Sequence, residues 1–512
     1  MSLAATSLAA KTSVDLDVVP MRVGSPGTSA IPDRDAGTIV NDVHSQLNET
    51  RVAGIVKPVT LDELRDVLAA ARRAGRSISI AGGRHAMGGQ QFGAGTILAD
   101  MRSLDRVLAF DASAGHVTAE AGIEWPALMS FLDRAQTNAT RPWGIYQKQT
   151  GADRLSLGGA LSSNVHGRGL TLKPIVQQVE AFDLMLHTGE VVRCSRTERP
   201  ELFRLAIGGY GLFGVITSVT LRLRPRVKVQ RVVRVVSSAD VMTLFDRRIR
   251  QGFLYGDFQF VTDDGGADFL RRGIMSCYRP VPAGTPLTAD PIRFTPEDWA
   301  RLTFYSHRDK RRAFDLYAGK YLETSGQVYW SDAQLFSSYV DHYHADLDRA
   351  LGACTKGSEM ITELYVPPAR LPAFLEEARA LLRRRRAQVI YGTVRLIEPD
   401  DETLLCWARQ RFACIVFNLH VDHEPAAIAR AAEVFRELID LAIAQNGSYY
   451  LTYHRWARRD QVELCYPQMR EFLAAKRRID PEELFQSDWY RYLTQGPQGP
   501  HGPQGPQGPE GP

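Results

Sequence analysis

The segment Ile80–Gly95, IAGGRHAMGGQQFGAG, constrains the fold of this chain more than any other, because six of its sixteen residues are glycine. Glycine at this density removes side chains from a loop and permits backbone conformations that other residues rarely adopt, so a ligand can lie against bare main chain. An amphipathic helix with a capping box at Thr60 and Glu63 precedes the loop, Gly75 ends that helix, and the β-like run SISI enters the loop. The sequence therefore predicts a nest of backbone N–H groups that can hold a diphosphate. The glycines of this nest are Gly82, Gly83, Gly88 and Gly89.

Length and composition indicate a globular enzyme with more than one domain. The 512 residues exceed what one ordinary hydrophobic core holds, and 44% hydrophobic with 23% charged residues is typical of soluble enzymes. The formal net charge is only +4, and the one dense basic run, Arg383–Arg386, ends an amphipathic helical pattern without interleaved aromatic residues. A solvated helix end explains this run better than nucleic-acid binding, so we expect no nucleic-acid partner.

The cysteines and the apolar pattern favour a cytoplasmic protein without a metal site. The six cysteines are scattered and form no CxxC pair, which argues against a disulfide framework and against a zinc site. No apolar run approaches the roughly 18 residues that a membrane span needs. The N-terminus MSLAATSLAAKTS lacks the basic and apolar regions of a secretion signal. The oligomeric state stays open.

Changes in composition divide the chain into five segments. Residues 1–40 are rich in Ser, Ala, Pro and Gly and predict a flexible leader, whereas residues 41–226 alternate helix and strand patterns. Long β-like stretches and amphipathic helices over residues 227–445 predict an α+β second domain, and residues 446–494 end the globular part. Residues 495–512 repeat Gly-Pro-x; collagen is the literal match, but so few triplets favour a disordered tail.

The segment Gly209–Gly214, GYGLFG, matches the GxGxxG fingerprint of Rossmann-type nucleotide sites. That fingerprint functions when a strand precedes it and a helix follows, because the helix N-terminus holds the pyrophosphate. Here a helical pattern, RPELFRLAIGG, precedes the match and a strand pattern, VITSVTLRL, follows it. The order is reversed, so we do not expect a Rossmann site here.

Five segments in this order resemble the vanillyl-alcohol oxidase/PCMH family of FAD-linked oxidoreductases: VAGIVKPVTLDELRDVL, AGGRHAMGGQ, SLGGALSSNVHGRG, GGYGLFGVITSVTLRL and YP…F…KRRIDPEELFQSDW. The resemblance covers residues 50–226 and again about 445–490. It implies an α+β fold with a two-lobed PCMH-type FAD-binding domain over 41–226. It also implies an α+β substrate-binding cap domain over 227–445 and a C-terminal segment that returns to the FAD domain.

The resemblance implies that FAD lies against the glycine loop and is bonded covalently through His85. In many members this loop reads G-H-S-x-x-G, and its histidine carries the 8α-methyl group of the flavin; here Arg84 replaces the glycine and Ala86 the serine. A histidine that only hydrogen-bonds the flavin or the backbone is the alternative. A second, cysteinyl link is excluded, because no cysteine lies between His85 and Cys194.

By the same resemblance, three parts of the chain contact FAD. In the loop these residues are Gly82, Gly83, Arg84, His85, Ala86, Met87, Gly88 and Gly89. In SLGGALSSNVHG, which resembles the flavin-contact segment of aldonolactone and alditol oxidases, they are Ser156, Gly158, Gly159, Ser162, Asn164, His166 and Gly167. Ile216 is expected near the adenine-ribose side through its backbone.

Oxidation of an alcohol by FAD requires polar groups around one carbon at the flavin face, one of which takes or relays a proton. The stretch YGTVRLIEPDDE resembles an E-x-R strand of alditol and sugar-lactone oxidases, with Arg395 as the arginine and Thr393 in the place of the glutamate. On the next strand, period-2 alternation puts Asn418 and His420 on one face.

The stretch GSYYLTYHRWARRDQVELCYP can be aligned in two ways. Compared with decaprenylphosphoryl-ribose oxidases, Tyr453 stands at the place of their pocket lysine. Compared with the HWGK motif of alditol oxidases, Trp456 matches and Arg458 replaces the lysine; we favour the first alignment. The expected catalytic residues are Arg395, His420 and Tyr453, and the expected substrate contacts are Tyr339, His342, Asn418 and Trp456.

The sequence thus predicts an FAD-dependent oxidoreductase that oxidises the C–OH group of a small alcohol, sugar or lactone by hydride transfer to flavin N5. Electrons would pass to oxygen or to another acceptor. One alternative is a dehydrogenase with a quinone or protein acceptor. A further alternative is a non-catalytic flavoprotein assembled through its collagen-like tail.

Overall fold

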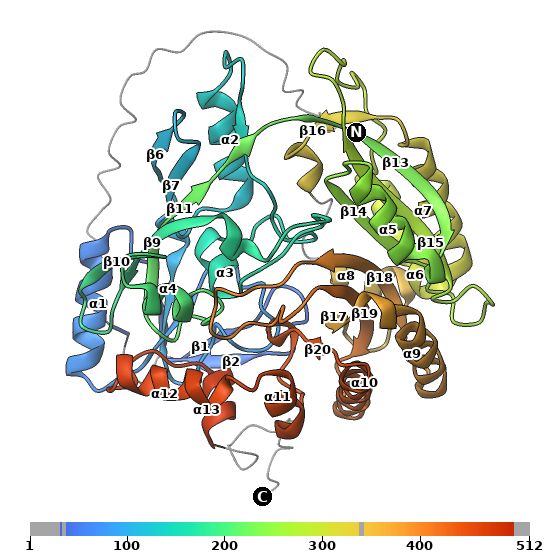
Figure 1. Ribbon diagram of the computed structural model, residues 1–512. Helices are drawn as coiled ribbons and strands as arrows, with labels where there is room; N and C mark the ends of the chain where they lie inside the picture. The colour runs from blue at the N-terminus through green and yellow to red at the C-terminus, as the bar shows by residue number, and fades with distance from the viewer. Residues whose placement is uncertain (1–30, 33–36, 337–342, 496–512) are drawn as a thin grey trace, which may run out of the picture.

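The computed structural model describes residues 31–32, 37–336 and 343–495 and forms an α+β fold (Figure 1). The Gly-Pro-x repeat and most of the predicted leader lie outside the described residues. The helices are α1 Leu61–Arg73, α2 Trp125–Ala135, α3 Leu157–Ser162, α4 Pro200–Ala206, α5 Val241–Arg250, α6 Pro296–Arg308, α7 Lys310–Glu323, α8 Tyr343–Leu351, α9 Leu371–Arg385, α10 Pro425–Ala444, α11 Arg459–Cys465, α12 Met469–Ile479 and α13 Asp488–Gln495.

The glycine loop follows a small parallel sheet with the strand order β3-β5-β4. Its strands are β3 Gly54–Val56, β4 Ile78–Ala81 and β5 Ile97–Asp100, and α1 connects β3 to β4. The Thr60 cap is confirmed, because its side chain accepts from the Glu63 N–H at 3.2 Å, but the Glu63 carboxylate accepts from the Val59 N–H at 2.9 Å, so the box is not reciprocal. Gly75 takes φ +60° after the helix. Leu64, Val67, Leu68 and Ala71 are buried, whereas Leu61 is 38% exposed.

A five-stranded antiparallel sheet, in the order β10-β9-β11-β7-β6, forms the second lobe. Its strands are β6 Val107–Asp111, β7 His116–Glu120, β9 Val179–Met185, β10 Val191–Ser195 and β11 Val215–Arg222. The expected hairpin turn at Thr188 and Gly189 is confirmed, with Gly189 at φ +86°. The remaining small sheets pair β1 Thr38–Val40 with β2 Thr50–Val52, and β8 Trp143–Gly144 with β12 Arg224–Pro225.

The second half of the chain builds an eight-stranded sheet in the order β16-β13-β15-β14-β18-β19-β17-β20. Its strands are β13 Lys228–Ser237, β14 Tyr255–Phe260, β15 Arg272–Pro280, β16 Val328–Trp330, β17 Gly357–Val366, β18 Val389–Ile397, β19 Phe412–Asp422 and β20 Ser448–Tyr449. One face packs against α5, α9 and α10 in the largest apolar core. On the opposite face Val233 and Ile274 pack against α6 and α7. That face also carries buried polar side chains on β17 and β18, among them Glu359, Glu363 and Arg395, and we call it the polar face.

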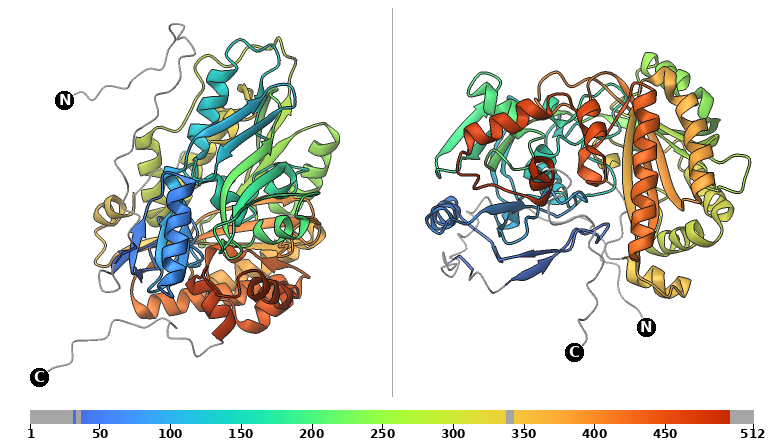
Figure 2. Two further views of the ribbon diagram at one scale, coloured as in Figure 1. Left: turned by 90° about the vertical axis from the view of Figure 1, so that its left-hand side faces the viewer. Right: turned by 90° about the horizontal axis from the view of Figure 1, so that it is seen from below.

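The C-terminal segment comes back to the N-terminal sheet (Figures 1 and 2). The Ile78 N–H donates to the Leu484 carbonyl at 2.7 Å, and the Gln486 N–H donates to the Ile78 carbonyl at 2.9 Å. Phe485 is buried beside this contact. The strand that enters the glycine loop is therefore held from both sides.

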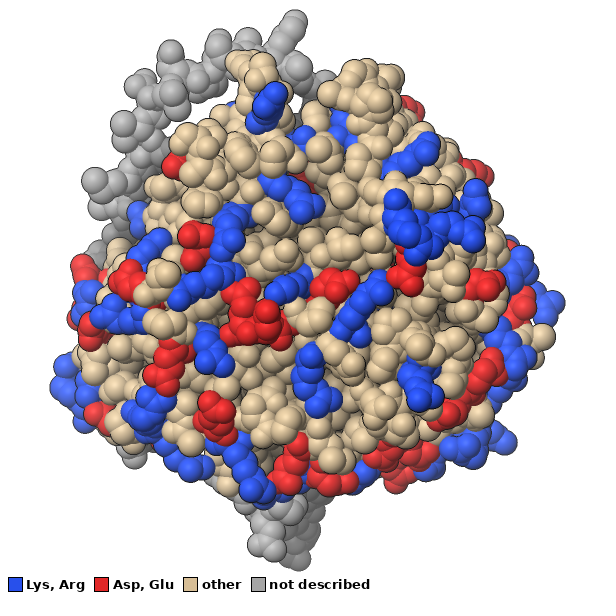
Figure 3. Space-filling model, in the orientation of Figure 1, with Lys and Arg blue, Asp and Glu red and all other residues tan. Residues whose placement is uncertain are grey.

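Two further features bear on the sequence predictions. On the face seen in Figure 3, Lys and Arg side chains alternate with Asp and Glu side chains rather than forming a field of one sign. The basic run Arg383–Arg386 stands at the end of α9, as expected, and Arg384 and Arg385 pair with Glu437. None of the described helices combines the length and the apolar character that crossing a membrane requires.

Candidate functional site

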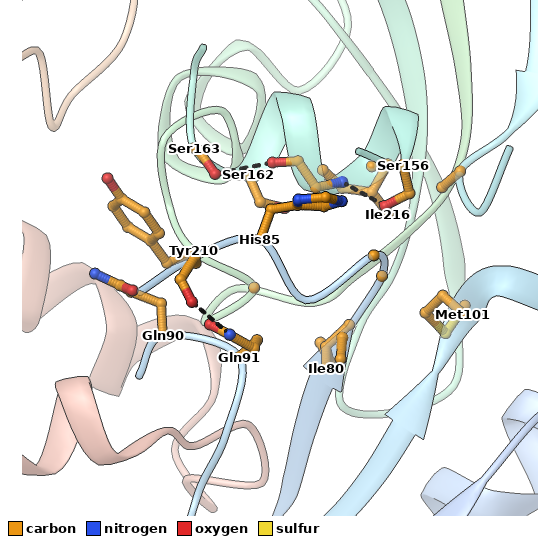
Figure 4. A pocket seen from close by; sticks show the side chains of 18 of the residues that line it. Ile80, His85, Gln90, Gln91, Met101, Ser156, Ser162, Ser163, Tyr210 and Ile216 are labelled. Carbon is orange, nitrogen blue, oxygen red and sulfur yellow. Dashed lines mark hydrogen bonds between the residues drawn. The ribbon is translucent and has the colours of Figure 1, made fainter. Parts of the chain in front are cut away.

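A cavity lies between the glycine loop, the N-terminus of α3 and the turn that precedes β11 (Figure 4). Ten residues expected to contact FAD line it: Gly82, Gly83, Arg84, His85, Ala86, Ser156, Gly158, Gly159, Ser162 and Ile216. The cavity also takes in Gln90, Gln91, Met101, Ala121, Leu155, Ser163, Tyr210, Gly211 and Gly214, which the sequence analysis did not name as contacts.

Glycine is required in the loop because other chain segments come close to it. A Cβ on Gly82 would overlap the Ser156 hydroxyl, and a Cβ on Gly83 would overlap the Arg154 carbonyl oxygen. Arg84 takes φ +59°, a left-handed conformation, at the position where the G-H-S-x-x-G pattern has glycine. The N–H groups of Gly83, Arg84 and Ala86 make no hydrogen bond within the described part of the chain. They are open to an anion, as the predicted nest requires; that they bind one stays a prediction.

Arg84 adds a cation that is only weakly held by the protein. Its guanidinium lies 3.4 Å from Asp100, which Arg102 already engages at 2.6 and 2.9 Å. The Arg84 Nε is buried and finds no hydrogen-bond partner among the described residues. Burial lowers the pKa of this guanidinium despite the Asp100 charge. An anionic group in the cavity would satisfy both the charge and the Nε–H.

His85 projects into the cavity wall and contacts a second histidine. Its Nδ1 lies 2.8 Å from His44 Nε2, and the two ring centroids are 4.9 Å apart. Burial lowers the pKa of His44 to about 4, so that His44 is neutral at physiological pH. Because a neutral imidazole carries one N–H, this contact couples the two tautomers: either His44 Nε2–H donates to His85 Nδ1, or His85 Nδ1–H donates to His44 Nε2.

The wall opposite the loop is the N-terminal turn of α3. Ser156 caps this helix by accepting from the Gly159 N–H at 3.3 Å, and the Ser163 hydroxyl donates to the Gly159 carbonyl at 2.9 Å. A Cβ on Gly158 would lie 2.9 Å from Ala121 Cβ, so glycine allows α3 to rest against the five-stranded sheet. This close packing places the helix terminus at the cavity.

The GYGLFG turn also lines the cavity, although not as a Rossmann loop. As expected, α4 precedes it and β11 follows it. Gly211 has φ +75° and Gly214 φ +149°, and the Tyr210 hydroxyl hydrogen-bonds Thr452 Oγ1 at 3.0 Å. The glycines of this turn indicate that a ligand can lie against its backbone. The sequence analysis named none of the turn's residues as contacts, because the GxGxxG match was interpreted only as a Rossmann fingerprint.

Six of the expected FAD contacts do not line the cavity, and most of them connect parts of the fold. The Met87 and Gly88 N–H groups donate to the Thr452 carbonyl, both at 3.0 Å. Asn164, at φ +48°, donates from Nδ2 to Asp400 at 2.8 Å. The remaining three are Gly89, His166 and Gly167. Whether any of these residues touches FAD stays a prediction.

His166 belongs to a second cluster, at the polar face of the eight-stranded sheet. Its Nε2 lies 2.6 Å from Glu363 Oε1, and its Nδ1 lies 3.0 Å from the Gly167 carbonyl. Arg395 and Tyr453 both interact electrostatically with Glu363. The structure thus brings together two of the three expected catalytic residues around a carboxylate that the sequence analysis did not name.

In the E-x-R pattern the glutamate would stand at Thr393, on β18. Glu363 stands instead on β17, two strands away in the sheet. Thr393, at that place, is buried and donates its hydroxyl to the Phe258 carbonyl at 3.0 Å. In the sheet, Val416 of β19 pairs with Thr393 on one side and with Glu363 on the other. Directly paired residues point to one face, so Glu363 and Thr393 share the face of Arg395.

The charges of this second cluster are set by burial and by its neighbours. Burial alone would raise the pKa of Glu363, but His166, Tyr365 and Arg395 outweigh it and hold the pKa below its usual value. Burial, and then the Glu363 charge, raises the pKa of Tyr453 well above its usual value. The cluster therefore presents a carboxylate and a neutral phenol, and beside them Arg395 has a buried Nε that no described residue satisfies.

The other expected substrate-side residues lie elsewhere. His420 is six residues along β19 from Cys414, the partner of Arg395, which corresponds to about 20 Å. Asn418 lies between them with a buried, unpartnered Oδ1 among the described residues. Trp456 stacks on Phe435 at 5.1 Å. Tyr339 and His342 lie outside the described residues.

A family model described as an FAD binding domain matches residues 52–195, the part of the chain that forms both the loop and the α3 wall. The chain carries a PCMH-type FAD-binding domain. The α+β fold agrees with this assignment. The residues fit the cofactor: the nest and Arg84 suit a diphosphate, and a cavity with glycine walls leaves room for an extended ligand.

Curated proteins resemble part or most of this chain. The chain is 28% identical over 196 residues to an L-gulonolactone oxidase of Bos taurus, which is 38% of this chain and 42% of that protein. It is 31% identical over 171 residues to the L-gulonolactone oxidase of Mus musculus, 33% of this chain and 37% of that protein. A longer match, 25% identical over 447 residues, covers 86% of this chain and 95% of an L-gulono-1,4-lactone dehydrogenase of Mycobacterium tuberculosis. The match thus spans about two fifths of the mammalian relatives' length.

Proposed function

We propose that this protein is an FAD-dependent oxidoreductase that oxidises the C–OH group of a small alcohol, sugar or lactone. One observation carries the proposal: the Arg395–Glu363–Tyr453 cluster lies directly behind the wall of the FAD cavity. The Tyr450 hydroxyl donates to the carbonyl of Ser163, a cavity residue, at 2.6 Å, and the Tyr450 ring contacts the Tyr453 ring at 5.4 Å. In this proposal residues 227–445 form the substrate-binding domain.

Bound FAD would accept a hydride at N5 and pass two electrons to an acceptor. The chain's own residues would bind and orient the hydroxylated carbon. The Arg395 guanidinium would attract the substrate hydroxyl oxygen and stabilise negative charge as its proton leaves. The neutral Tyr453 phenol would donate a hydrogen bond to a neighbouring substrate oxygen.

The His166–Glu363 pair is the proposed proton acceptor. The Gly167 carbonyl can only accept, so the contact at 3.0 Å requires a hydrogen on His166 Nδ1. The Nε2–Oε1 contact at 2.6 Å then needs a second proton between the two groups. The pair must lose that shared proton before it can take one from substrate, so we expect kcat/KM to rise with pH through one apparent pKa of the pair.

We further propose that His85 bonds covalently to the flavin. The ring lies in the cavity wall, and if its Nδ1–H donates to His44, the lone pair of Nε2 would be left to bond the 8α-methyl carbon. That carbon would lose a proton in exchange, and the two electrons would pass through the flavin to the same acceptor that the proposed oxidation uses. Acid precipitation of the purified protein tests the bond. We expect flavin in the pellet for the wild type and in the supernatant for His85→Ala; flavin in the wild-type supernatant would exclude the link.

A substrate screen tests the proposed activity. The wild type should reduce oxygen or a dye with at least one alcohol, sugar or lactone, and comparison of the two acceptors separates an oxidase from a dehydrogenase. Arg395→Lys should lower kcat/KM while flavin content stays unchanged, and Arg279→Lys, an exposed arginine on β15, is the matched control. A flavin-loaded wild type that is inactive throughout, or an Arg395→Lys variant as active as its control, would contradict the proposal.

A further inference from the structure

A second group of ionisable side chains lies on the polar face of the eight-stranded sheet, away from Arg395. Glu359 of β17 is 4% exposed and is surrounded by His307 of α6, His344 of α8 and His420 of β19. Glu359 precedes Glu363 by four residues on the same strand, about 13 Å. The group is therefore distinct from the proposed reaction site.

The two oxygens of Glu359 have different surroundings. Oε2 accepts from the Tyr343 hydroxyl and lies 3.0 Å from His344 Nδ1. Oε1 faces His307 Nε2 at 3.2 Å and His420 Nδ1 at 3.3 Å. The first pair of contacts orients the carboxylate, and the second places two imidazole nitrogens around one oxygen.

His307 distinguishes this arrangement from a simple ion-pair cluster. Its side chain is 8% exposed, and although Nε2 is 3.2 Å from the carboxylate, the atom makes no hydrogen bond to any residue that the structure describes. A buried ring nitrogen without a hydrogen bond is costly. It lies beside Glu359 Oε1 and His420 Nδ1, and the three atoms are all within 4.8 Å of one another.

Two of the three separations fall in the range that a metal ion imposes on its ligands. Two ligands at about 2.0–2.1 Å from a metal, subtending 90–110°, are about 2.8–3.4 Å apart. The two nitrogen–oxygen distances of 3.2 and 3.3 Å fall within that interval. The other nitrogen of His420 lies 3.4 Å from Asp422, which resembles the carboxylate–histidine–metal relay found behind metal ligands.

We propose that His307 Nε2, His420 Nδ1 and Glu359 Oε1 bind one divalent transition-metal ion, most suitably zinc. Two imidazoles and a carboxylate are borderline ligands that select zinc, cobalt or nickel over magnesium or calcium. The ion would join α6 to β17 and β19 and keep a position open for water. The sequence analysis expected no metal site, because the three ligands are distant in sequence and form no short-spaced pattern.

Room for the His420 ligand depends on a glycine. A Cβ on Gly357, the partner strand's first residue, would lie 2.8 Å from His420 Nε2 and even closer to the ring carbon beside it. The absence of a side chain at this position lets the ring turn its Nδ1 toward Glu359. The same close approach limits the rotamers that His420 can adopt.

Metal titration of the untagged, flavin-loaded full chain tests the proposal. After treatment with chelator and dialysis, Co²⁺ should bind one equivalent per chain and produce ligand-field bands at longer wavelengths than the flavin absorbs. Zn²⁺ should displace these bands and raise the melting temperature. A wild type that shows no such bands and retains no zinc after gel filtration would overturn the proposal.

Two variants separate metal binding from a structural ion pair. His307→Gln removes one proposed ligand, so the variant should show no Co²⁺ bands and its melting temperature should not rise when Zn²⁺ is added, whatever its metal-free melting temperature. His420→Gln should also lose the Co²⁺ bands. His116→Gln, on β7 outside the group, is the control and should bind metal as the wild type does. Unchanged metal stoichiometry in both cluster variants, or a Zn²⁺-dependent rise in the melting temperature of His307→Gln equal to that of the wild type, would contradict the assignment.

Discussion

Replacement of Gly82 by alanine should disrupt FAD binding through one defined overlap. The new Cβ would coincide with the Ser156 hydroxyl and lie 2.9 Å from Ser156 Cβ, against 3.4–4 Å for ordinary contact. Either the loop or the N-terminus of α3 must therefore shift by about 0.5–1 Å, which exceeds the precision of about 0.5 Å that a preorganised site tolerates. Overpacking of this kind costs about 1–3 kcal/mol.

The assay is flavin content and affinity. If the whole cost falls on the bound state, FAD affinity should fall about 5- to 150-fold. The purified Gly82→Ala protein should then contain less flavin per chain, and titration of the apoprotein should give a weaker Kd. Gly284→Ala is the control, because its Cβ would meet no atom within 4 Å.

A second substitution makes the reasoning refutable. Ser156→Gly removes both atoms that the new Cβ would meet, while a glycine N-cap costs α3 only a few tenths of a kcal/mol. The double variant Gly82→Ala/Ser156→Gly should recover most of the flavin content. Full flavin loading in Gly82→Ala alone, or no recovery in the double variant, would refute the assignment of the overlap.

Other perturbations have equally definite outcomes. Glu363→Gln should lower kcat/KM about 10²- to 10⁴-fold without loss of flavin, since it removes a proposed proton-accepting group; steady-state kinetics with flavin absorbance measure both quantities. Asn164→Ala should destabilise the protein by about 1–3 kcal/mol in urea unfolding, because it removes one of the donors to buried Asp400, whose other donors are on Glu402 and Thr403, and places alanine at φ +48°. Burial lowers the pKa of His44 to about 4 and of His454 to about 3, both below the unfolded value of 6.5, so the unfolded chain binds protons first as pH falls. Stability should therefore decrease below pH 6.5 by up to about 1.4 kcal/mol per pH unit for each histidine, and a pH series of unfolding curves in which His454→Gln keeps the full slope would contradict this.

Features that depend on neighbouring residues could be predicted from the sequence. The Thr60 cap and the helices α9 and α10 follow from local periodicity and local capping. The same holds for the reversed order around GYGLFG. Local patterns of this kind predict the folded structure correctly because the interacting residues lie within one or two helical turns of one another or on the adjoining element.

Features that depend on partners far away in the chain could not be predicted from the sequence. Asn164 and His166 sit in a segment that fits a flavin contact, yet their side chains bind Asp400 and Glu363, which are 236 and 197 residues further along. Only the register of β17 with β19 reveals that Glu363 faces Arg395. Period-2 alternation placed Asn418 and His420 on the correct common face, but it carries no information about how far along the sheet the cofactor lies.

The segment around Asp42 links the two groups of histidines. Asp42 accepts hydrogen bonds from the N–H groups of His44 and Ser45, at 3.0 and 2.6 Å, and so fixes a tight turn. One side of that turn presents His44 to His85 in the cavity wall, and on the other side the Ser45 carbonyl accepts from Ser358, the neighbour of Glu359. The turn belongs to the N-terminal part of the chain, whereas Ser358 belongs to β17. The orientation of the proposed flavin-linking residue and the position of the proposed metal ligands therefore rest on one short stretch, and displacement of this turn would move both.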